Sequence, residues 1–476
     1  MAIITPLLYA LSLGLPAVHA LTLHERDSPA VIGFDVQRRS VRNASPGWRD
    51  RLRRRSSTVS TTLYNEETMY LANISIGTPA QDVEVVLDTG SSDLWVNTPT
   101  SDLCSESTDE CAYGTYDPDD SSTYSYVSSD FDITYGDGSS ASGDYANDTV
   151  RIGGKTLKNF RLGIGLNSTT TDNLLGIGYP LDEAQASTDG TYPNLPRALV
   201  NAGYIKSSAY SLWLNDLDSG SGSILFGGVD SAKYSGTLET LPVQKVDGEY
   251  AAFVLALTGV ALNSSGTVQK YSSSSLPLGV LLDSGTSLIY LADDLVEDLY
   301  TNLSVTYESE AGVGYVPCSL ADEDYTLDFT FSSPTIRVDI SELVLYDGDI
   351  TYDDGTPACV FGIAPGGDTS ILGDTFLRSA YVVYDLSNNE ISLANTKFNV
   401  TDSDIKEIGT GTTAVPGATA VANPVTTLAK GADATEPVGV GSIPSSTGSV
   451  KGAAVALPVP CSIALAASLL ALTLAL

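Results

Sequence analysis

The chain contains the segment Val85-Val86-Leu87-Asp88-Thr89-Gly90-Ser91-Ser92-Asp93-Leu94-Trp95. A run of β-branched and apolar residues ends here in a carboxylate, and the chain then turns at once through Thr-Gly-Ser. The pattern predicts a buried strand with an acidic side chain at its end, where ionisation is costly unless a neighbouring group shares the charge. A single Asp-Thr-Gly is weak evidence of a catalytic site, because Asp and Gly are also ordinary β-turn residues.

A second copy of the pattern lies in the other half of the chain, as Val280-Leu281-Leu282-Asp283-Ser284-Gly285-Thr286-Ser287-Leu288. Two apolar residues and a glycine follow each copy at nearly equal spacing, in Leu174-Leu175-Gly176 and Ile371-Leu372-Gly373. Glycine would let a crossing strand pass close to each turn without a steric clash. We therefore predict an internal duplication whose pseudo-two-fold axis brings Asp88 and Asp283 face to face.

Length and patterning set the fold class. A chain of 476 residues is too long for one core of ordinary size, so at least two globular units are expected. Alternating Val, Ile, Tyr and Thr runs dominate and helical periodicity is scarce, which predicts an all-β fold with two similar lobes, 56–240 and 241–400. Only residues 195–202 and 292–302 have the character of short surface helices.

The charge balance is strongly acidic, with 24 Lys and Arg against 58 Asp and Glu and a net charge of −34. Residues 21–55 are the exception, because they hold many arginines. The acidic body should repel nucleic acid and anionic lipid and attract cationic substrates, so we exclude a nucleic-acid partner. The acidity has a second interpretation, as an adaptation for solubility and for work at low pH.

The N-terminal region has the features of a secreted precursor. Residues 1–20 have an apolar centre and end in Val18-His19-Ala20, which indicates a signal peptide. Residues 21–55 end in a basic run at Arg55 and are predicted to be a propeptide, removed to start the mature chain near Ser56. We expect this basic propeptide to lie in or near the acidic cleft until it is cleaved, and so to be a partner of the enzyme.

The C-terminal region predicts a surface anchor. Residues 401–452 are rich in Thr, Ala, Gly, Ser, Pro and Val without periodicity, which is typical of an extended stalk. Residues 453–476 are apolar with no basic residues behind them, which favours a glycosylphosphatidylinositol (GPI) signal that is removed over a membrane-spanning anchor. Ser446 and Gly452 are both candidate attachment residues, and the protein is expected on the extracellular face of the plasma membrane or wall.

Cysteines and sequons fit an oxidising compartment. Cys104 and Cys111 could close a small loop and Cys318 and Cys359 a longer one, which leaves Cys461 as the odd residue. With His19 and His24 as the only histidines, we expect no metal site and no cofactor. Candidate N-glycosylation sites are Asn73, Asn147, Asn167, Asn263, Asn302 and Asn399.

The chain resembles the pepsin-like aspartic endopeptidases from about residue 64 to residue 398. The resemblance rests on both Asp motifs and on five further segments, namely 70–81, Ile133-Thr-Tyr-Gly-Asp-Gly-Ser139, Gly176-Ile-Gly-Tyr-Pro180, 224–230 and 371–378. The propeptide, stalk and GPI-type tail are most similar to the yapsin-like, surface-anchored fungal branch. The resemblance implies a monomeric bilobal fold and the hydrolysis of peptide and protein substrates without a cofactor.

The resemblance also implies roles for individual residues. Asp88 and Asp283 would share one proton and activate a water molecule. The turn support would come from Thr89, Gly90, Ser91, Ser284, Gly285 and Thr286, where Thr89 and Thr286 resemble the family's turn hydroxyls and Ser91 is a donor to Asp88. Tyr135, Gly136 and Asp137 would form the tip of a flap over the substrate, with Trp95 as the hydrogen-bonding neighbour of Tyr135.

Three further questions stay open at the level of the sequence. Cleavage at or beside basic residues is favoured by the acidic surface and by the yapsin-like resemblance, and a preference for apolar residues is the alternative. A catalytically inactive pepsin-like protein that binds or inhibits a partner is one alternative to an enzyme. An anchored structural protein of the wall is another, suggested by the stalk and anchor alone.

Overall fold

The structure is a computed structural model, and it describes residues 30–40, 68–105, 111–136, 138–219, 221–309, 311–346 and 350–429. All of these residues belong to the first of two compact units, Met1–Gly441. The predicted signal peptide, Ser446, Gly452, Cys461 and the apolar C-terminal segment lie outside the described residues. Among the residues that are described, no helix combines the length and the apolar character needed to cross a membrane.

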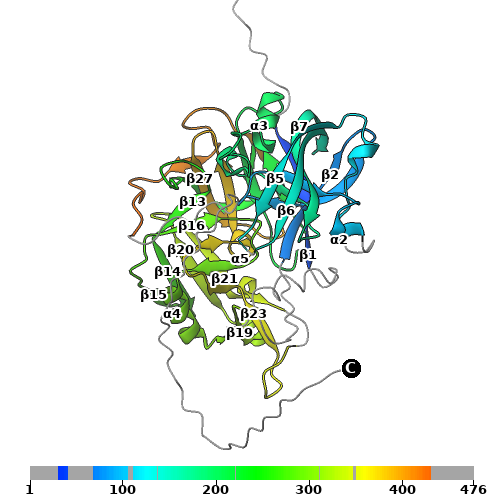
Figure 1. The fold of residues 1–476 in the computed structure, drawn as a ribbon. Coiled ribbons are helices and arrows are strands. Elements are labelled where there is room, and N and C mark those ends of the chain that lie inside the picture. Colours follow the sequence, from blue (N-terminus) through cyan, green and yellow to red (C-terminus); the bar gives the residue numbers. More distant parts are fainter. Residues whose placement is uncertain are drawn as a thin grey trace, which may run out of the picture. The chain divides into compact units, whose positions relative to one another are not determined.

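A 14-stranded sheet runs through the described part of the chain (Figure 1). In spatial order its strands are β29 (Ala418–Ala420), β12 (Tyr234–Pro242), β27 (Glu390–Thr396), β26 (Ala380–Asp385), β9 (Ala209–Trp213), β10 (Ser221–Phe226), β1 (Ile32–Ser40), β2 (Thr68–Ile76), β3 (Gln81–Asp88), β8 (Leu174–Gly176), β4 (Leu94–Asn97), β7 (Lys155–Ser168), β6 (Ser140–Ile152) and β5 (Ser125–Thr134).

The remaining strands form four smaller sheets. The first contains β13 (Val254–Leu257), β16 (Leu278–Leu282), β25 (Ile371–Leu372), β17 (Ile289–Leu291) and β24 (Ile363–Pro365). The second contains β15 (Thr267–Tyr271), β14 (Gly259–Ser264), β20 (Tyr325–Thr330) and β21 (Thr335–Asp339), and the third contains β18 (Thr306–Glu308), β19 (Val313–Pro317), β23 (Ala358–Phe361) and β22 (Val344–Leu345). The fourth pairs β11 (Gly228–Asp230) with β28 (Ile405–Glu407).

Helices are few and short. The α-helices are α2 (Asp102–Ser105), α3 (Leu195–Asn201), α4 (Asp293–Leu303) and α5 (Asp374–Leu377), and the 3-10 helices are η2 (Pro118–Asp120), η3 (Pro180–Asp182), η4 (Cys318–Asp322) and η5 (Ile340–Leu343). Helices α3 and α4 confirm the two predicted from the sequence. The all-β, bilobal fold is confirmed as well.

The internal duplication is visible in the strand pairing. Strand β3 runs parallel to β8, with Asp88 opposite Gly176, and β4 pairs with the other side of β8 in the antiparallel sense. In the second half β16 runs parallel to β25, with Leu282 opposite Leu372, and β17 pairs antiparallel with β25. These central strands are apolar on both faces because both faces are covered, and the same arrangement in each half places an Asp turn at the same point.

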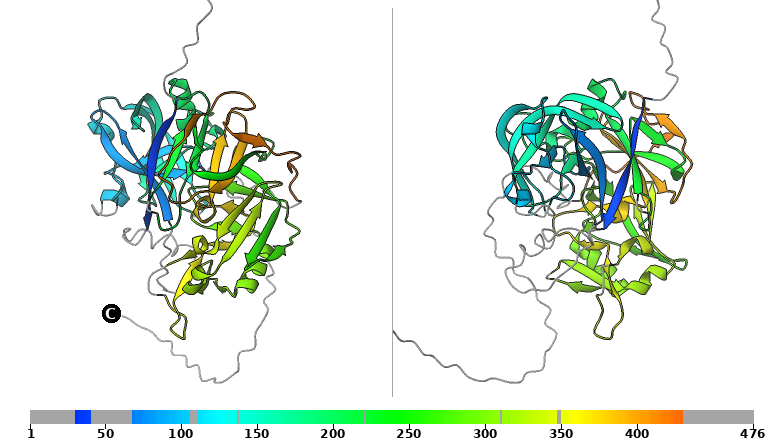
Figure 2. Two further views of the ribbon diagram at one scale, coloured as in Figure 1. Left: turned by 180° about the vertical axis from the view of Figure 1, so that it is seen from behind. Right: turned by 90° about the vertical axis from the view of Figure 1, so that its right-hand side faces the viewer.

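Strand β1 comes from the predicted propeptide. It pairs antiparallel with β10 on one side and with β2 on the other, and Ile32 and Val36 are buried in the core. In Figure 2 it is the dark blue strand that crosses the sheet. We expected residues 21–55 in or near the cleft, but residues 30–40 line no part of it and complete the sheet instead, because their buried apolar side chains match a strand. Residues 21–29 and 41–55 lie outside the described residues.

Residues 401–429 also differ from expectation. Their composition predicted the start of an extended stalk, but β28 pairs with β11 and β29 pairs parallel with β12. Ile408 is fully buried. The segment lacks the hydrophobic periodicity of a helix or strand, which predicted an extended chain here. In the structure a few apolar residues hold the segment against the body.

The structure joins Cys104 to Cys111 and Cys318 to Cys359 by disulfide bonds. Four of the candidate glycosylation residues are exposed, namely Asn73, Asn167, Asn302 and Asn399, and Asn263 is half-buried. Asn147 is also half-buried, and its Oδ1 accepts a hydrogen bond from Arg161 Nε. Asn147 and Asn263 are therefore less accessible to a glycan than the other four.

Candidate active site

The first Asp turn is held by backbone contacts from β8. The backbone carbonyl of Asp88 accepts from Ile177 N at 2.9 Å, just beyond the end of that strand. The carboxylate accepts from Gly90 N at 2.7 Å on Oδ1 and from Ser91 Oγ at 2.5 Å on Oδ2. The turn therefore fixes the orientation of the Asp88 carboxylate with one backbone donor and one hydroxyl.

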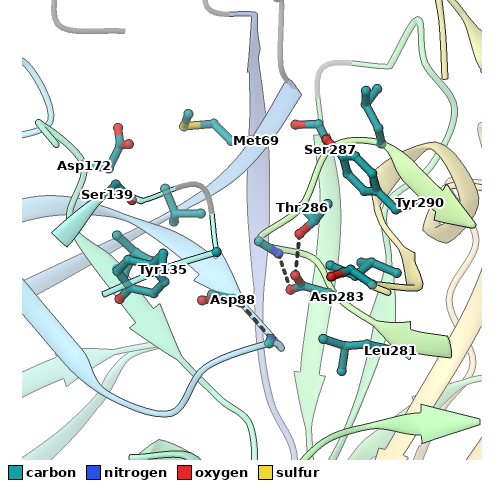
Figure 3. Close-up of a pocket in the computed structure, with 18 of the residues that line it drawn as sticks. Met69, Asp88, Tyr135, Ser139, Asp172, Leu281, Asp283, Thr286, Ser287 and Tyr290 are labelled. Carbon is teal, nitrogen blue, oxygen red and sulfur yellow. Dashed lines mark hydrogen bonds between the residues drawn. The ribbon is translucent and has the colours of Figure 1, made fainter. Parts of the chain in front are cut away.

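The second Asp turn repeats this arrangement (Figure 3). Asp283 Oδ1 accepts from Gly285 N at 2.8 Å, and Oδ2 accepts from Thr286 Oγ1 at 2.5 Å. Asp283 N donates to the carbonyl of Leu372 in β25 at 3.2 Å. Ser91 and Thr286, each three residues after its aspartate, are thus the corresponding hydroxyl donors of the two halves.

The two turns are joined to each other by Thr89 and Ser284. Thr89 Oγ1 donates to Leu282 O at 2.9 Å and accepts from Ser284 N at 3.0 Å. Ser284 Oγ donates to Leu87 O at 2.8 Å and accepts from Thr89 N at 3.2 Å. We expected Thr89 to correspond to Thr286, but in the structure it corresponds to Ser284, because the hydroxyls of Thr89 and Ser284 connect the halves.

Glycines bring the two carboxylates together. A Cβ atom on Gly90 would lie 2.6 Å from the carboxyl carbon of Asp283, and one on Gly285 would lie 2.5 Å from Asp88 Oδ1. Any side chain at either position would displace the carboxylate of the other half. The close packing around the aspartates thus explains why each turn needs glycine.

The crossing strands are similarly tight. A Cβ atom on Gly176 would lie 2.4 Å from Ser92 N, and one on Gly373 would lie 2.3 Å from Thr286 O. Both contacts are with backbone atoms that cannot move aside. Gly176 and Gly373 therefore allow the close approach that their spacing predicted.

Burial and mutual repulsion set the ionisation of the pair. Both carboxylates are buried. Desolvation, followed by the neighbouring Asp283, raises the pKa of Asp88 well above its usual range, while the hydrogen bond from Ser91 acts in the opposite direction. Protonation of Asp88 therefore relieves the repulsion between the two buried carboxyls.

A hairpin tip covers the Asp88 side of the pair. Strands β5 and β6 form the hairpin, and Gly138 takes a positive φ of 82° at its turn. The hydroxyl of Tyr135 accepts from Trp95 Nε1 at 2.7 Å. Burial and the nearby Asp88 raise the pKa of Tyr135 well above its usual range, so this hydroxyl stays protonated. Asp137, the remaining residue of the predicted tip, lies outside the described residues.

A cleft of about 370 Å³ opens at the two aspartates. Tyr135 and Gly136 line it from the hairpin, and Tyr290 lines it from the second half (Figure 3). Apolar side chains line it together with small polar residues and glycines, the apolar ones being Met69, Val86, Leu174, Leu281, Leu288, Pro365 and Ile371. Such a lining with two acids at its centre suits an extended peptide whose side chains alternate between its walls.

One further acid in the cleft was not found from the sequence. Asp172 lines the cleft near the hairpin and is buried, and its Oδ2 accepts from Thr170 Oγ1 at 2.8 Å. It precedes β8 by two residues, so its position relative to Leu174-Leu175-Gly176 could have indicated it. No group of residues suited to a metal ion occurs among the described residues.

Other buried carboxyls lie behind the first turn. Asp93 accepts from Tyr192 Oη at 2.5 Å, from Tyr145 Oη at 3.1 Å and from Ala184 N at 2.8 Å. Glu183 Oε2 accepts from Tyr192 N at 2.7 Å, and burial raises its pKa to about 9. Burial likewise raises the pKa of Asp182. The sequence shows that the chain has many acidic residues and few basic ones, but it did not predict which of the carboxyls are buried.

Comparison with known proteins assigns this arrangement. The family model described as eukaryotic aspartyl protease matches residues 69–396. A probable aspartic-type endopeptidase opsB of Aspergillus fumigatus is 57% identical, over 86% of this chain and 85% of the relative. Secreted aspartic protease 7 of Candida albicans is 37% identical, over 71% of this chain and 62% of the relative. The crystal structure of an aspartic proteinase from Irpex lacteus has the same fold, with a TM-score of 0.57 at 22% identity over 71% of this chain and 96% of that one.

Proposed function

The chain belongs to the eukaryotic aspartyl protease family and is an aspartic endopeptidase, and from that premise we propose that Asp88 and Asp283 are its catalytic pair. The observation that carries the proposal is the mutual approach of the two turns. Each carboxylate lies against the glycine of the opposite turn, and Thr89 and Ser284 hold the turns together through reciprocal hydrogen bonds.

The proposed mechanism uses one proton shared by the pair. The ionised aspartate removes a proton from a water molecule as its oxygen attacks the peptide carbonyl carbon. The protonated aspartate donates to the carbonyl oxygen, which gives a neutral tetrahedral intermediate. Collapse of this intermediate breaks the C–N bond and returns a proton to the amine, so no acyl-enzyme forms.

The hairpin tip acts as a flap in this proposal. Tyr135 lies over the Asp88 side of the cleft, and its hydrogen bond from Trp95 fixes the ring. Closing the tip over a bound peptide would exclude bulk water from the pair and strengthen its electrostatic interactions.

Two variants test the catalytic pair. Asp88→Asn and Asp283→Asn should each lower kcat for a peptide substrate, measured at acidic pH, by at least about 10³-fold. The amide side chain of asparagine cannot share the proton that the two carboxyls hold. Asp322→Asn, an exposed carboxylate in η4, is the matched control and should be unchanged. A statin-type transition-state mimic should bind the unmodified enzyme only. Full turnover in either variant would contradict the assignment.

We also propose a preference for basic residues next to the scissile bond, with Asp172 as the receiving carboxylate. Its buried place in the cleft wall near the flap supports the proposal, because a cation is attracted most strongly to a carboxylate shielded from solvent. Asp172→Asn should lower kcat/KM by about tenfold for peptides with Lys or Arg at the preferred position and leave apolar peptides unchanged. An apolar preference in the unmodified enzyme would contradict it.

We propose, further, that the protein is secreted, processed and held at the cell surface. The signal peptide, the basic propeptide, the exposed sequons and the apolar C-terminus support this, and one similar protein is named as secreted. Treating cells with a phosphatidylinositol-specific phospholipase should release the active enzyme into the medium. The released enzyme should be a monomer whose N-terminus lies near Ser56. Activity that stays on the cell through both phospholipase treatment and wall digestion would contradict a GPI anchor.

A further inference from the structure

The sheet that joins the two halves has apolar side chains on both of its faces. Along β26, Ala380, Val382 and Tyr384 belong to the main core, whereas the alternate residues Tyr381 and Val383 belong to a separate apolar cluster. The neighbouring strands show the same alternation, and the second face is made by Ala209, Trp213, Tyr381, Val383 and Ala394. This second face, which we call the outer face, needs a cover of its own.

The cover comes largely from the segment that follows the family match. Ile408, Ala414 and Val415 are buried in the same cluster as the outer face, and Ala418 packs against it. The family model ends at residue 396, so none of these residues belongs to the part of the chain that it describes. In Figures 1 and 2 the orange segment lies at the edge of the body beside β27.

Backbone pairing fixes the first part of this segment. Residues Ile405 to Glu407 pair with β11, and Ile408 N donates to Gly227 O at 2.8 Å. Asp230 accepts from Ser403 Oγ at 2.7 Å and from Asp404 N at 2.7 Å. These hydrogen bonds join the first part of the segment to β11 and to the residue just before it.

The second part of the segment crosses to the other half of the chain. Strand β29 adds to the edge of the large sheet beside β12, and Val421 N donates to Thr240 O at 2.9 Å. Val425 N then donates to Ser332 Oγ at 2.9 Å and Ala429 N to Pro277 O at 2.9 Å. The segment therefore contacts the first half near its start and the second half near its end, and it covers an otherwise open sheet edge.

We propose that residues 401–429 are a C-terminal clasp, a segment whose binding site is the outer face of the sheet and whose attachment completes the catalytic body. Without it, Trp213, Tyr381 and Val383 would form an exposed apolar patch of the kind that soluble proteins avoid. The tether to any anchor therefore starts after Ala429 and not at residue 401. Release of an intact enzyme requires a cut beyond Ala429, whereas a cut before Ile408 frees the clasp from its covalent link.

Hydrogen exchange on the unmodified full chain tests the clasp directly. Backbone amides of Ile408, Ala418 and Val421 should exchange at least about 100-fold more slowly than the same amides in an unfolded peptide, because each N–H is hydrogen-bonded to a backbone carbonyl. A flexible stalk would exchange at the unfolded rate from residue 401 onward, and that result would overturn the proposal. The measurement needs no variant and does not depend on the catalytic assignment.

A matched pair of variants tests whether the clasp stabilises the body. Ile408 is 0% exposed and Ile405 is 40% exposed, three residues apart on the same segment. Ile408→Asp should lower the thermal midpoint of the full chain by about 5 °C or more, since it places a charge in an apolar cluster. Ile405→Asp should move it by less than about 1 °C. Equal midpoints for the two variants would overturn the proposal, and the cleft's activity on a short peptide reports independently on catalysis.

A cut introduced after folding tests where the tether begins. A specific protease site inserted between residues 429 and 430 should be cleaved readily, with the thermal midpoint unchanged within about 1 °C. The same site inserted between residues 407 and 408 should either resist cleavage or, once cleaved, lower the thermal midpoint of the protein. Rapid cleavage without loss of stability at the second site would overturn the proposal.

Discussion

The Asp88 turn and the Asp283 turn make the same hydrogen bonds in different surroundings. Each carboxylate accepts from the glycine two residues on and from a hydroxyl three residues on. Five residues after Asp88, however, the chain has the buried Asp93, and the corresponding position after Asp283 is the buried Leu288. The duplication thus preserves the contacts that orient the carboxylates and lets the layer behind them diverge.

The buried charges behind the two turns are balanced by different groups. In the first half, Asp93 and Glu183 are held by tyrosine hydroxyls and backbone N–H groups. In the second half, Glu342 forms an ion pair with the fully buried Arg378 at 2.5 Å. Burial raises the pKa of Asp93 and Glu183, and the hydrogen bonds that they accept lower it only in part. Burial also raises the pKa of Asp374 in the second half, so each half holds a buried carboxyl that binds its proton tightly.

The largest effect is expected where the two halves touch. Gly90→Ala and Gly285→Ala should each lower kcat by about 10³-fold or more, because the added methyl group would displace the opposite carboxylate from its hydrogen bonds. Equal losses would show that the two turns are equivalent in catalysis. Steady-state kinetics on one peptide, with a thermal melt of each variant, measures both activity and folding.

A glycine outside the site provides the control for these variants. A Cβ atom on Gly259 would have Thr330 Cβ at 3.8 Å as its nearest neighbour, which is ordinary contact. Gly259→Ala should therefore keep full activity. If Gly90→Ala also kept full activity, the carboxylates would have room to move, and the tight packing of the turns would not be required for catalysis.

The sequence predicted the duplicated turns better than it predicted what surrounds them. The two Asp motifs and the later glycines recur at fixed spacing, and the all-β bilobal fold follows from that repeat. The partners of Thr89 could not be predicted, because a hydroxyl's choice between its own carboxylate and the other half depends on how the halves meet. Asp172 was missed because nothing local distinguishes a cleft-lining acid from the many surface acids of this chain.

The two ends of the body were predicted least well. Residues 30–40 were assigned by their basic flank to the cleft, yet Val36 is buried in the sheet. Residues 401–429 were assigned by composition to a stalk, yet Ile408 is buried in the same apolar cluster as Tyr381 and Val383. Composition reports the average polarity of a segment, whereas a few apolar residues at the right places decide whether it binds a neighbouring surface. The apolar pattern on both faces of β26 was the available signal that a cover existed.

The second prediction tests the difference in buried charge. Burial raises the pKa of Glu183 from 4.5 to about 9, so the folded protein holds this proton more tightly than the unfolded chain does. The stabilisation is fully present below pH 4.5 and declines as the pH rises toward 9, by about 3 kcal/mol between pH 4.5 and pH 7. Glu183→Gln should remove that part of the decline, so thermal melts at pH 4.5 and pH 7 should differ less than in the unmodified protein.

An exposed glutamate supplies the comparison for that melt series. Glu249 lies on the surface in the second half, and Glu249→Gln should leave the difference between the two pH values unchanged. Nearby charges also act on Glu183, since Asp93 raises its pKa and Arg161 lowers it. Should Glu183→Gln melt with the same pH dependence as the unmodified protein, that dependence would reside in other buried carboxyls, such as Asp374.

The smallest effect is expected from the hydroxyl that each half donates to its own aspartate, from Ser91 in the first half and from Thr286 in the second. Ser91→Ala and Thr286→Val each remove one charge-assisted hydrogen bond to a carboxylate and should lower kcat by about 10- to 100-fold. The bond from Ser91 lowers the pKa of Asp88, so its loss raises that pKa further. The acidic limb of the kcat/KM profile should then move to higher pH in Ser91→Ala. Similar rate losses in both variants would mean that the pair draws on both hydroxyls equally, whereas a loss confined to Ser91→Ala would place the functional asymmetry in the turn beneath the flap.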